Sequence, residues 1–263
     1  MGKIGEKFKN LLSQRKKAFI PFFTAFYPSK ELFREFLKRA DDVGVDFIEV
    51  GIPFSDPLAD GKMIQYSSKW SLEREFSFSR FLEEIGRLKN HLNSSLILMS
   101  YFNPILQRGI TNFAKEMKEA SIEGVIVPNL PFEESYSLKE VLSSHGIDLI
   151  YLLAPTTRPQ RMRKISAHSQ GFIYLVSLTG VTGMRENLPE NLVAYIRQVR
   201  EITSKPLCVG FGISNPCQAK KVAELSDGVI VGSALINLLK GREREKGVSR
   251  EVENILKEFR RVI

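Results

Sequence analysis

Short apolar runs alternate with longer amphipathic segments along most of the chain. Eight of these runs are rich in β-branched and aromatic residues, and each precedes a segment with apolar residues at helical spacing. We predict strands at residues 18–26, 46–54, 95–105, 124–130, 148–154, 172–178, 206–211 and 228–231. We predict helices at residues 30–43, 111–120, 133–144, 159–168, 190–202, 216–225 and 250–262, with further helical segments before residue 91 and through residue 239.

The predicted strands are apolar throughout, as is typical of parallel strands that are covered on both faces. Eight such strand–helix units in 263 residues indicate an α/β fold, a (β/α)₈ TIM barrel. A doubly wound open sheet is the alternative. No linker or low-complexity tract divides the chain, so we expect one domain over residues 1–263. Residues 1–17 form an extra N-terminal amphipathic helix, with Ile4, Phe8, Leu11 and Leu12 on one face.

Composition narrows the class of protein. Hydrophobic residues make up 43% and charged residues 26%, which excludes a disordered, collagenous or coiled-coil chain. The net charge of +8 is spread over many helices without a nucleic-acid-binding motif, so we expect no nucleic-acid partner. No apolar run approaches the roughly 20 residues of a membrane span, and the cytoplasm is the expected location. Cys208 and Cys217 lack metal-ligand spacing and are expected to be buried, reduced thiols.

The sequence lacks the residues that several kinds of catalysis require. The active site of a barrel lies at the C-terminal ends of its strands. His91, His145 and His168 fall instead near helix ends that lead into the next strand. No predicted strand contains a lysine for imine chemistry, and no cluster of histidines and carboxylates offers a metal site. We therefore expect no metal.

Carboxylates remain as catalytic candidates. Glu49 interrupts an apolar strand, where burial can tune a carboxyl group for proton transfer. The alternative is an ion pair across the barrel rim. Asp56 and Asp60 follow in the loop above the same strand, and ordinary turn chemistry is their alternative.

Small residues dominate the loops after the last three predicted strands, at residues 179–183, 210–214 and 231–233. Glycines let backbone N–H groups approach phosphate oxygens, and a helix N-terminus adds partial positive charge. We interpret these loops as a phosphate site, with tight βα turns as the alternative. Apolar residues near the early strands suggest an aromatic or apolar substrate body, unless they only pack the core: Phe22, Phe23, Tyr101 and Phe102.

One sequence motif resembles the signature of a known family. Residues 47–61, Phe-Ile-Glu-Val-Gly-Ile-Pro-Phe-Ser-Asp-Pro-Leu-Ala-Asp-Gly, resemble the signature of the tryptophan synthase alpha chain family. Further matches lie at residues 100–105, 154–157, 178–183, 209–214 and 227–235. The resemblance covers about residues 17–240. It implies a (β/α)₈ barrel that cleaves indole-3-glycerol phosphate to indole and glyceraldehyde 3-phosphate without a cofactor of its own. It also implies an αββα complex, in which indole passes through a tunnel to a PLP-dependent beta chain.

The resemblance also assigns roles to individual residues. It implies that Glu49 is the acid/base, that Asp60 is the second catalytic carboxyl, and that Tyr174 lies near the reacting centre. The phosphate cradle corresponds to Gly183, Gly212, Gly232 and Ser233. Thr182 belongs to the segment that resembles a mobile lid and is expected to contact Asp60. The segment facing the beta chain includes Pro53 and Asp56.

The chain departs from the family pattern at two places. Phe26 and Tyr27 stand where the family has a Gly-Asp turn, which should change the rim there, and Asn129 stands where the family has an aspartate. These departures leave open a non-catalytic partner that only activates a beta chain. Another phosphate-binding barrel lyase or isomerase is a further alternative. Retention of both Glu49 and Asp60 favours an active lyase.

Overall fold

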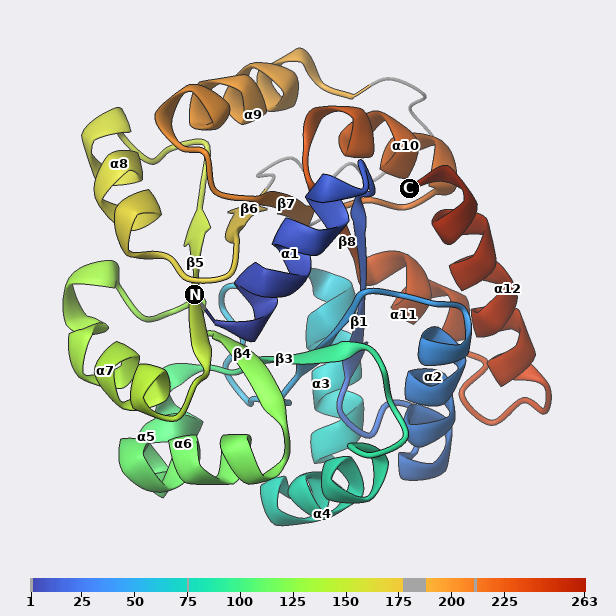
Figure 1. Cartoon of the computed structure of the whole chain (residues 1–263). Helices are drawn as coiled ribbons and strands as arrows, with labels where there is room; N and C mark the ends of the chain where they lie inside the picture. The colour runs from blue at the N-terminus through green and yellow to red at the C-terminus, as the bar shows by residue number, and fades with distance from the viewer. Residues whose placement is uncertain (1, 75, 177–187, 211) are drawn as a thin grey trace.

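Eight parallel strands close into a barrel in sequence order, with β8 pairing to β1 (Figure 1). The computed structural model describes residues 2–74, 76–176, 188–210 and 212–263. The strands are β1 (Ala18–Thr24), β2 (Phe47–Gly51), β3 (Ser95–Met99), β4 (Ile122–Ile126), β5 (Asp148–Leu153), β6 (Ile173–Val176), β7 (Leu207–Gly210) and β8 (Gly228–Val231). The predicted (β/α)₈ barrel is confirmed, and the open doubly wound sheet is excluded.

Helices surround the barrel, as Figure 1 shows. They are α1 (Lys3–Ser13), α2 (Lys30–Asp42), α3 (Lys62–Leu72), α4 (Phe78–Leu88), α5 (Phe102–Arg108), α6 (Ile110–Glu119), the 3₁₀ turn η1 (Phe132–Glu134), α7 (Tyr136–Ser144), α8 (Pro159–His168), α9 (Glu190–Ile202), α10 (Pro216–Leu225), α11 (Ser233–Leu239) and α12 (Val248–Val262). Among the described helices, none is long and apolar enough to cross a membrane.

The largest error of the sequence-based prediction lies after β3. The apolar run at residues 95–105 is too long for one strand, because β3 ends at Met99 and α5 begins at Phe102. The backbone N–H of Phe102 donates to Asn129 Oδ1 at 2.9 Å, which satisfies one of the free donors of the first helical turn. Pro104 is tolerated there because the first turn of a helix does not use its N–H groups internally.

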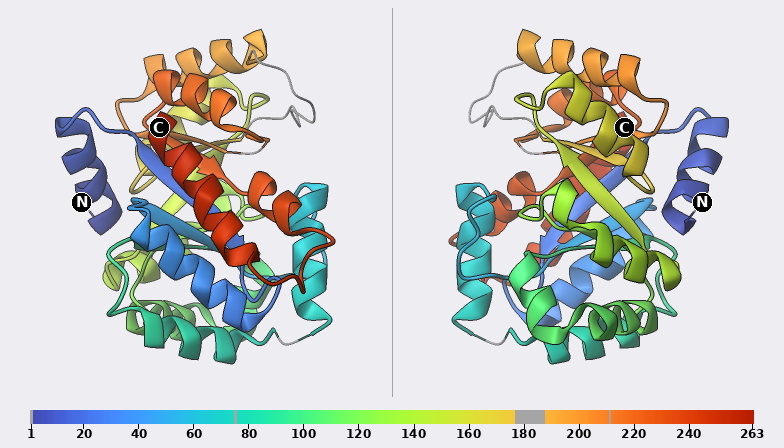
Figure 2. Two further views of the ribbon diagram at one scale, coloured as in Figure 1. Left: turned by 90° about the vertical axis from the view of Figure 1, so that its right-hand side faces the viewer. Right: turned by 90° about the vertical axis from the view of Figure 1, so that its left-hand side faces the viewer.

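The extra helix α1 closes the N-terminal end of the barrel, on the side opposite α3 (Figure 2). Phe8 stacks on Phe47 at a centroid distance of 4.9 Å and contacts Phe172 at 5.5 Å. Ile4 fills the space that a side chain at Gly124 would occupy, because a Cβ there would lie 2.4 Å from Ile4 Cδ1. Leu12 on the same helix is less covered and remains 39% exposed.

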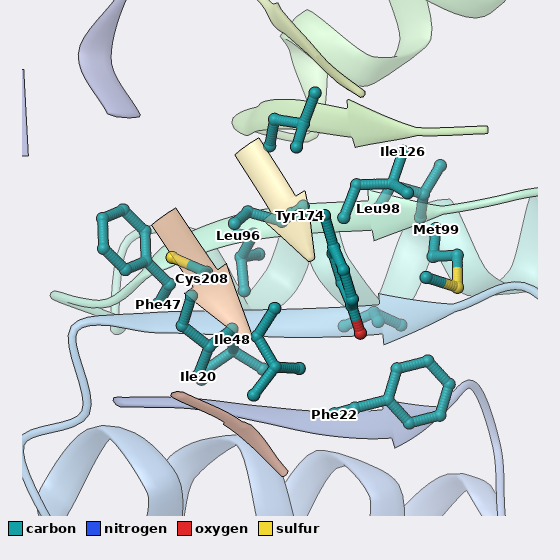
Figure 3. Packing of buried hydrophobic residues seen from close by; sticks show 14 of the residues in the cluster. Ile20, Phe22, Phe47, Ile48, Leu96, Leu98, Met99, Ile126, Tyr174 and Cys208 are labelled. Atoms are coloured by element: carbon teal, nitrogen blue, oxygen red, sulfur yellow. The ribbon is translucent and has the colours of Figure 1, made fainter. Parts of the chain in front are cut away.

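The barrel interior has two distinct ends. Figure 3 shows Phe47 and Cys208 at the N-terminal end and Phe22 and Met99 toward the C-terminal end, with the Tyr174 hydroxyl pointing to the latter. His168 ends α8, His145 directly follows α7, and His91 lies three residues beyond α4, so all three are away from the C-terminal ends of the strands, as predicted. Cys208 is buried, but Cys217 is exposed on α10, so the expectation of two buried thiols is wrong.

Replacing Phe8 with alanine tests the role of α1. The change removes a ring stacked between Phe47 and Phe172, and we expect a loss of about 3–5 kcal/mol in the free energy of unfolding because a cavity remains. Chemical denaturation measures the loss. Leu12→Ala on the same helix is the control and should cost less than about 1 kcal/mol, because this side chain is part exposed. Equal losses in the two variants would contradict the proposed packing.

Candidate active site

Glu49 is a fully buried carboxyl group within an apolar strand. It lies in the middle of β2, in register with Phe22 on β1 and Ile97 on β3. The residue is 0% exposed, and neither carboxyl oxygen has a hydrogen-bond partner among the described residues. The ion pair that was the structural alternative is not found among the residues that the structure describes. Burial, together with the nearby negative charge of Asp60, raises the pKa of Glu49 to about 8.

Asp60 lies in the loop between β2 and α3, and the contacts of its side chain differ from those of its backbone. The backbone forms the turn, since Asp60 N donates to Pro57 O at 3.0 Å and Gln65 Nε2 donates to Asp60 O at 2.8 Å. The carboxylate instead accepts a hydrogen bond from the Tyr101 hydroxyl, which itself accepts from Ala59 N at 3.0 Å. Burial raises the pKa of Asp60 to about 6, and the Tyr101 hydrogen bond opposes that rise.

The two carboxyls are thus tuned to different protonation states. Each lies in the field of the other, so they titrate as a pair. At neutral pH the fully buried Glu49 holds its proton, and Asp60 is the group that ionises first. Such a pair combines a proton donor with a negative charge in one place.

Tyr174 lies beside both carboxyls. Burial raises the pKa of its phenol, and the charges of Glu49 and Asp60 raise it further. The ring is seated against β7, where a Cβ on Gly210 would lie 2.3 Å from the Tyr174 hydroxyl oxygen. Glycine at position 210 is therefore required for this close approach.

The Phe22 side chain packs against Gly51 at the end of β2 and against Gly232 after β8. A Cβ on Gly51 would lie 2.4 Å from Phe22 Cζ, and a Cβ on Gly232 would lie 3.1 Å from Phe22 Cβ. The Phe22 side chain therefore lies between Gly51 and Gly232, with its ring tip at Gly51 and its Cβ at Gly232. Phe23 does not belong to this site, because it faces outward and stacks on Phe36 of α2 at 5.9 Å. Phe102 lies in α5.

Backbone N–H groups gather after β7 and β8. Gly212 has a φ of +88°, a conformation that favours glycine. Gly232 is the residue before α11, whose first helical bond runs from Ile236 N to Gly232 O at 3.1 Å. The N–H groups of Ser233 and the next two residues precede that bond, so they have no acceptor within the helix. Thr182 and Gly183, predicted for the lid and the phosphate cradle, lie outside the described residues.

The loop between β2 and α3 also presents the predicted partner residue Asp56. This residue is exposed and accepts from Ser55 Oγ at 2.7 Å, and the neighbouring Leu58 is 92% exposed. Pro53 is buried in the isolated chain. Of the two residues predicted to face a partner, only Asp56 therefore lies on the surface.

Two of the three departures from the family pattern are buried, and Asn129 is exposed. Phe26 and Tyr27 are 3% and 2% exposed, so they change packing below the rim rather than its solvent-facing surface. Asn129 accepts the α5 N–H through its amide oxygen.

Sequence reasoning missed two polar contacts to Asp60. In the sequence, Tyr101 reads as an apolar ring and Gln65 has no distinguishing pattern. The available signal was a tyrosine close after the end of β3, the strand that pairs with β2, whose loop carries Asp60. Among the described residues, no group of three or more metal-binding side chains comes together.

Comparisons with known proteins identify the family of the chain. The family model of the tryptophan synthase alpha chain matches residues 8–263. The tryptophan synthase alpha chain of Picosynechococcus sp. is 43% identical over 240 residues, covering 91% of each chain. That of Arabidopsis thaliana is 42% identical, covering 98% of this chain and 94% of the relative.

A solved structure gives the same result. The crystal structure of tryptophan synthase subunit alpha from Legionella pneumophila superposes with a TM-score of 0.91 at 36% identity, covering 100% of this chain and 98% of the other. The resemblance noted in the sequence therefore extends over the whole fold, and the chain belongs to the tryptophan synthase alpha chain family.

Proposed function

We propose that Glu49 and Asp60 perform the family reaction in this chain, the cleavage of indole-3-glycerol phosphate to indole and glyceraldehyde 3-phosphate. The observation that carries the proposal is the buried, unpartnered Glu49 carboxyl beside an Asp60 carboxyl of lower pKa. A retro-aldol cleavage needs one group that gives and then takes a proton, and a second that stabilises positive charge. Protonated Glu49 and ionised Asp60 supply these two roles at neutral pH.

The proposed steps balance in protons. Glu49 delivers its proton to indole C3, and the positive charge that develops on the ring is stabilised by the Asp60 carboxylate at the indole N–H. The Glu49 carboxylate then removes the proton from the C3′ hydroxyl. The bond between C3 and C3′ breaks, its electron pair returns to the ring, and the C3′ oxygen becomes the aldehyde. Glu49 ends protonated, ready for the next substrate.

The remaining residues are proposed to hold the substrate. The N–H groups at Gly212, Gly232 and Ser233 bind the phosphoryl group, supported by the positive end of α11. Phe22 and Tyr174 line the space between this end and the carboxyls. Thr182 and Gly183 are proposed, on the family resemblance, to complete the lid and the cradle.

We further propose that the chain works with a PLP-dependent beta chain in an αββα complex in the cytoplasm, and passes indole to it. The exposed Leu58 and Asp56 at the tip of the loop after β2 supply an apolar and a charged contact beside the site. A partner that only activates a beta chain, without catalysis, remains the competing function. The retained carboxyl pair argues against it.

Substitution of each carboxyl tests the catalytic assignment. We expect Glu49→Gln and Asp60→Asn each to lower turnover at least ~10²-fold, the usual scale for loss of an acid–base group. Indole release from indole-3-glycerol phosphate, with and without a beta chain, measures it. Asp148→Asn is the matched control, because Asp148 is also a buried carboxyl with a pKa raised to about 6, but it begins β5 at the other end of the barrel.

Near-normal turnover in both Glu49→Gln and Asp60→Asn would refute the assignment. Absence of turnover in the unsubstituted protein even with a beta chain would leave only the activating role.

The pH dependence of kcat/KM tests the protonation states. Activity should fall below about pH 6 as Asp60 gains a proton, and above about pH 8 as Glu49 loses one. Tyr101→Phe removes a hydrogen bond that lowers the pKa of Asp60. In this variant the low-pH limb should therefore move to higher pH while the high-pH limb changes less. A low-pH limb that stays in place, or moves to lower pH, contradicts the role of Asp60.

A further inference from the structure

One carboxylate oxygen joins three separate segments near the C-terminal end of the barrel. Glu243, in the connection between α11 and α12, is 9% exposed. Its Oε1 accepts a hydrogen bond from the Tyr66 hydroxyl at 2.6 Å and from the Tyr27 hydroxyl at 3.2 Å. Tyr66 lies on α3 and Tyr27 in the loop between β1 and α2. Burial opposes ionisation of Glu243, but the hydrogen bonds prevail and keep its pKa below the ordinary value.

Aromatic packing strengthens this junction. Tyr27 meets Tyr66 and Trp70 edge to face, both at 6.2 Å. Trp70 Nε1 donates to Pro28 O at 2.9 Å, and the hydroxyls of Thr24 and Ser67 are 2.6 Å apart. The loop after β1 is therefore tied to α3 through rings and hydrogen bonds.

The same loop holds an unfavourable backbone conformation. Phe26 has a φ of +61°, a region that favours glycine, yet its ring is buried edge to face against Phe33 at 5.8 Å and Phe76 at 5.9 Å. Burial of the ring offsets the backbone cost. Because the family pattern has Gly-Asp where this chain has Phe26 and Tyr27, the Tyr27–Glu243 hydrogen bond is a departure from that pattern.

Helix α3 in turn holds Asp60. The helix begins at Lys62, directly after the Asp60 loop. Gln65, the neighbour of Tyr66, donates to Asp60 O at 2.8 Å and to Pro57 O at 3.4 Å. A displacement of the first turns of α3 would therefore carry the backbone of Asp60 with it.

Helix α11 lies beside α3 (Figure 2). Glu243 lies in the connection shortly after the end of α11. The Lys240 ammonium lies 4.9 Å from the centre of the Tyr66 ring, between the end of α11 and Glu243. The connection that carries Glu243 thus contacts α3 at two points. The position of α3 is fixed from the side of α11 as well as from β1.

We propose that Glu243 is a positioning residue for Asp60: by holding Tyr66 and Tyr27 together it sets the place of α3, and through Gln65 the place of the Asp60 loop. This inference rests on the proposed catalytic role of Asp60. Glu243 itself does not touch the substrate, so it affects how well Asp60 is placed rather than how tightly the phosphate is held.

Three variants test the proposal by indole release. Glu243→Ala removes the shared acceptor and should lower kcat by about tenfold or more, with KM changed by less than about threefold, because a small misplacement of a catalytic group is costly. Glu243→Gln keeps an acceptor oxygen for both hydroxyls and should restore kcat to within about threefold of the unsubstituted enzyme. Tyr66→Phe deletes only the shorter bond and should fall between the two.

Tyr151→Phe is the matched control. It also deletes a buried tyrosine hydroxyl, which lies 2.6 Å from Ser135 Oγ, but it leaves α3 untouched, so kcat should not change. The proposal is overturned if Glu243→Ala keeps its kcat, or if Glu243→Gln is as impaired as Glu243→Ala. If Glu243→Ala does not fold, an unchanged kcat in Tyr66→Phe overturns it equally. Asp60→Asn is assayed alongside, because normal turnover there would instead refute the proposed function.

Discussion

The proposed chemistry depends on one constraint, the burial of the Glu49 carboxyl group away from water. Glu49 is fully buried in β2 with no partner for either oxygen among the described residues. An isolated carboxylate in such a place is strongly disfavoured, so the group stays neutral well above its ordinary pKa. The same burial therefore creates a proton donor at neutral pH. Asp60, with a tyrosine hydroxyl to stabilise its charge, remains the better anion of the pair. The chemistry follows from this difference in environment rather than from residue type.

The contacts of α1 that stabilise the barrel and the proposed active site lie at opposite ends of the barrel. The N-terminal end is sealed by α1, whose Phe8 and Ile4 fill the space beneath the strands. The C-terminal end carries side chains of the proposed site, and the Tyr174 hydroxyl points toward it (Figure 3). Between these ends, Phe22, Glu49 and Tyr174 lie on β1, β2 and β6.

The sequence predicted the elements better than the contacts between them. The bounds of α8, α9, α10 and β8 agree with the predictions, because proline, glycine and capping residues mark them locally. Glu49 was recognisable as a charge within an apolar strand. Phe22 and Phe23 were not distinguishable, because strands covered on both faces are apolar on both sides and show no alternation. The hydrogen bond between Tyr101 and Asp60 joins residues far apart in sequence, so it depends on packing that no local pattern records. The exposure of Cys217 was missed, because this residue lies in the first turn of α10 and local sequence does not show which way that turn faces.

The ring of Phe22 occupies room that two glycines leave vacant. Gly51 and Gly232 lie on different strands or turns, far apart along the chain, and each approaches this ring too closely to carry a side chain without movement. A methyl group at position 51 would lie 2.4 Å from the ring and would force it to move, whereas one at position 232 would lie 3.1 Å from Phe22 and needs only a small shift. Side chains at positions 22, 51 and 232 therefore compete for one volume, so the energetic effect of a substitution at one of them depends on the residues at the other two.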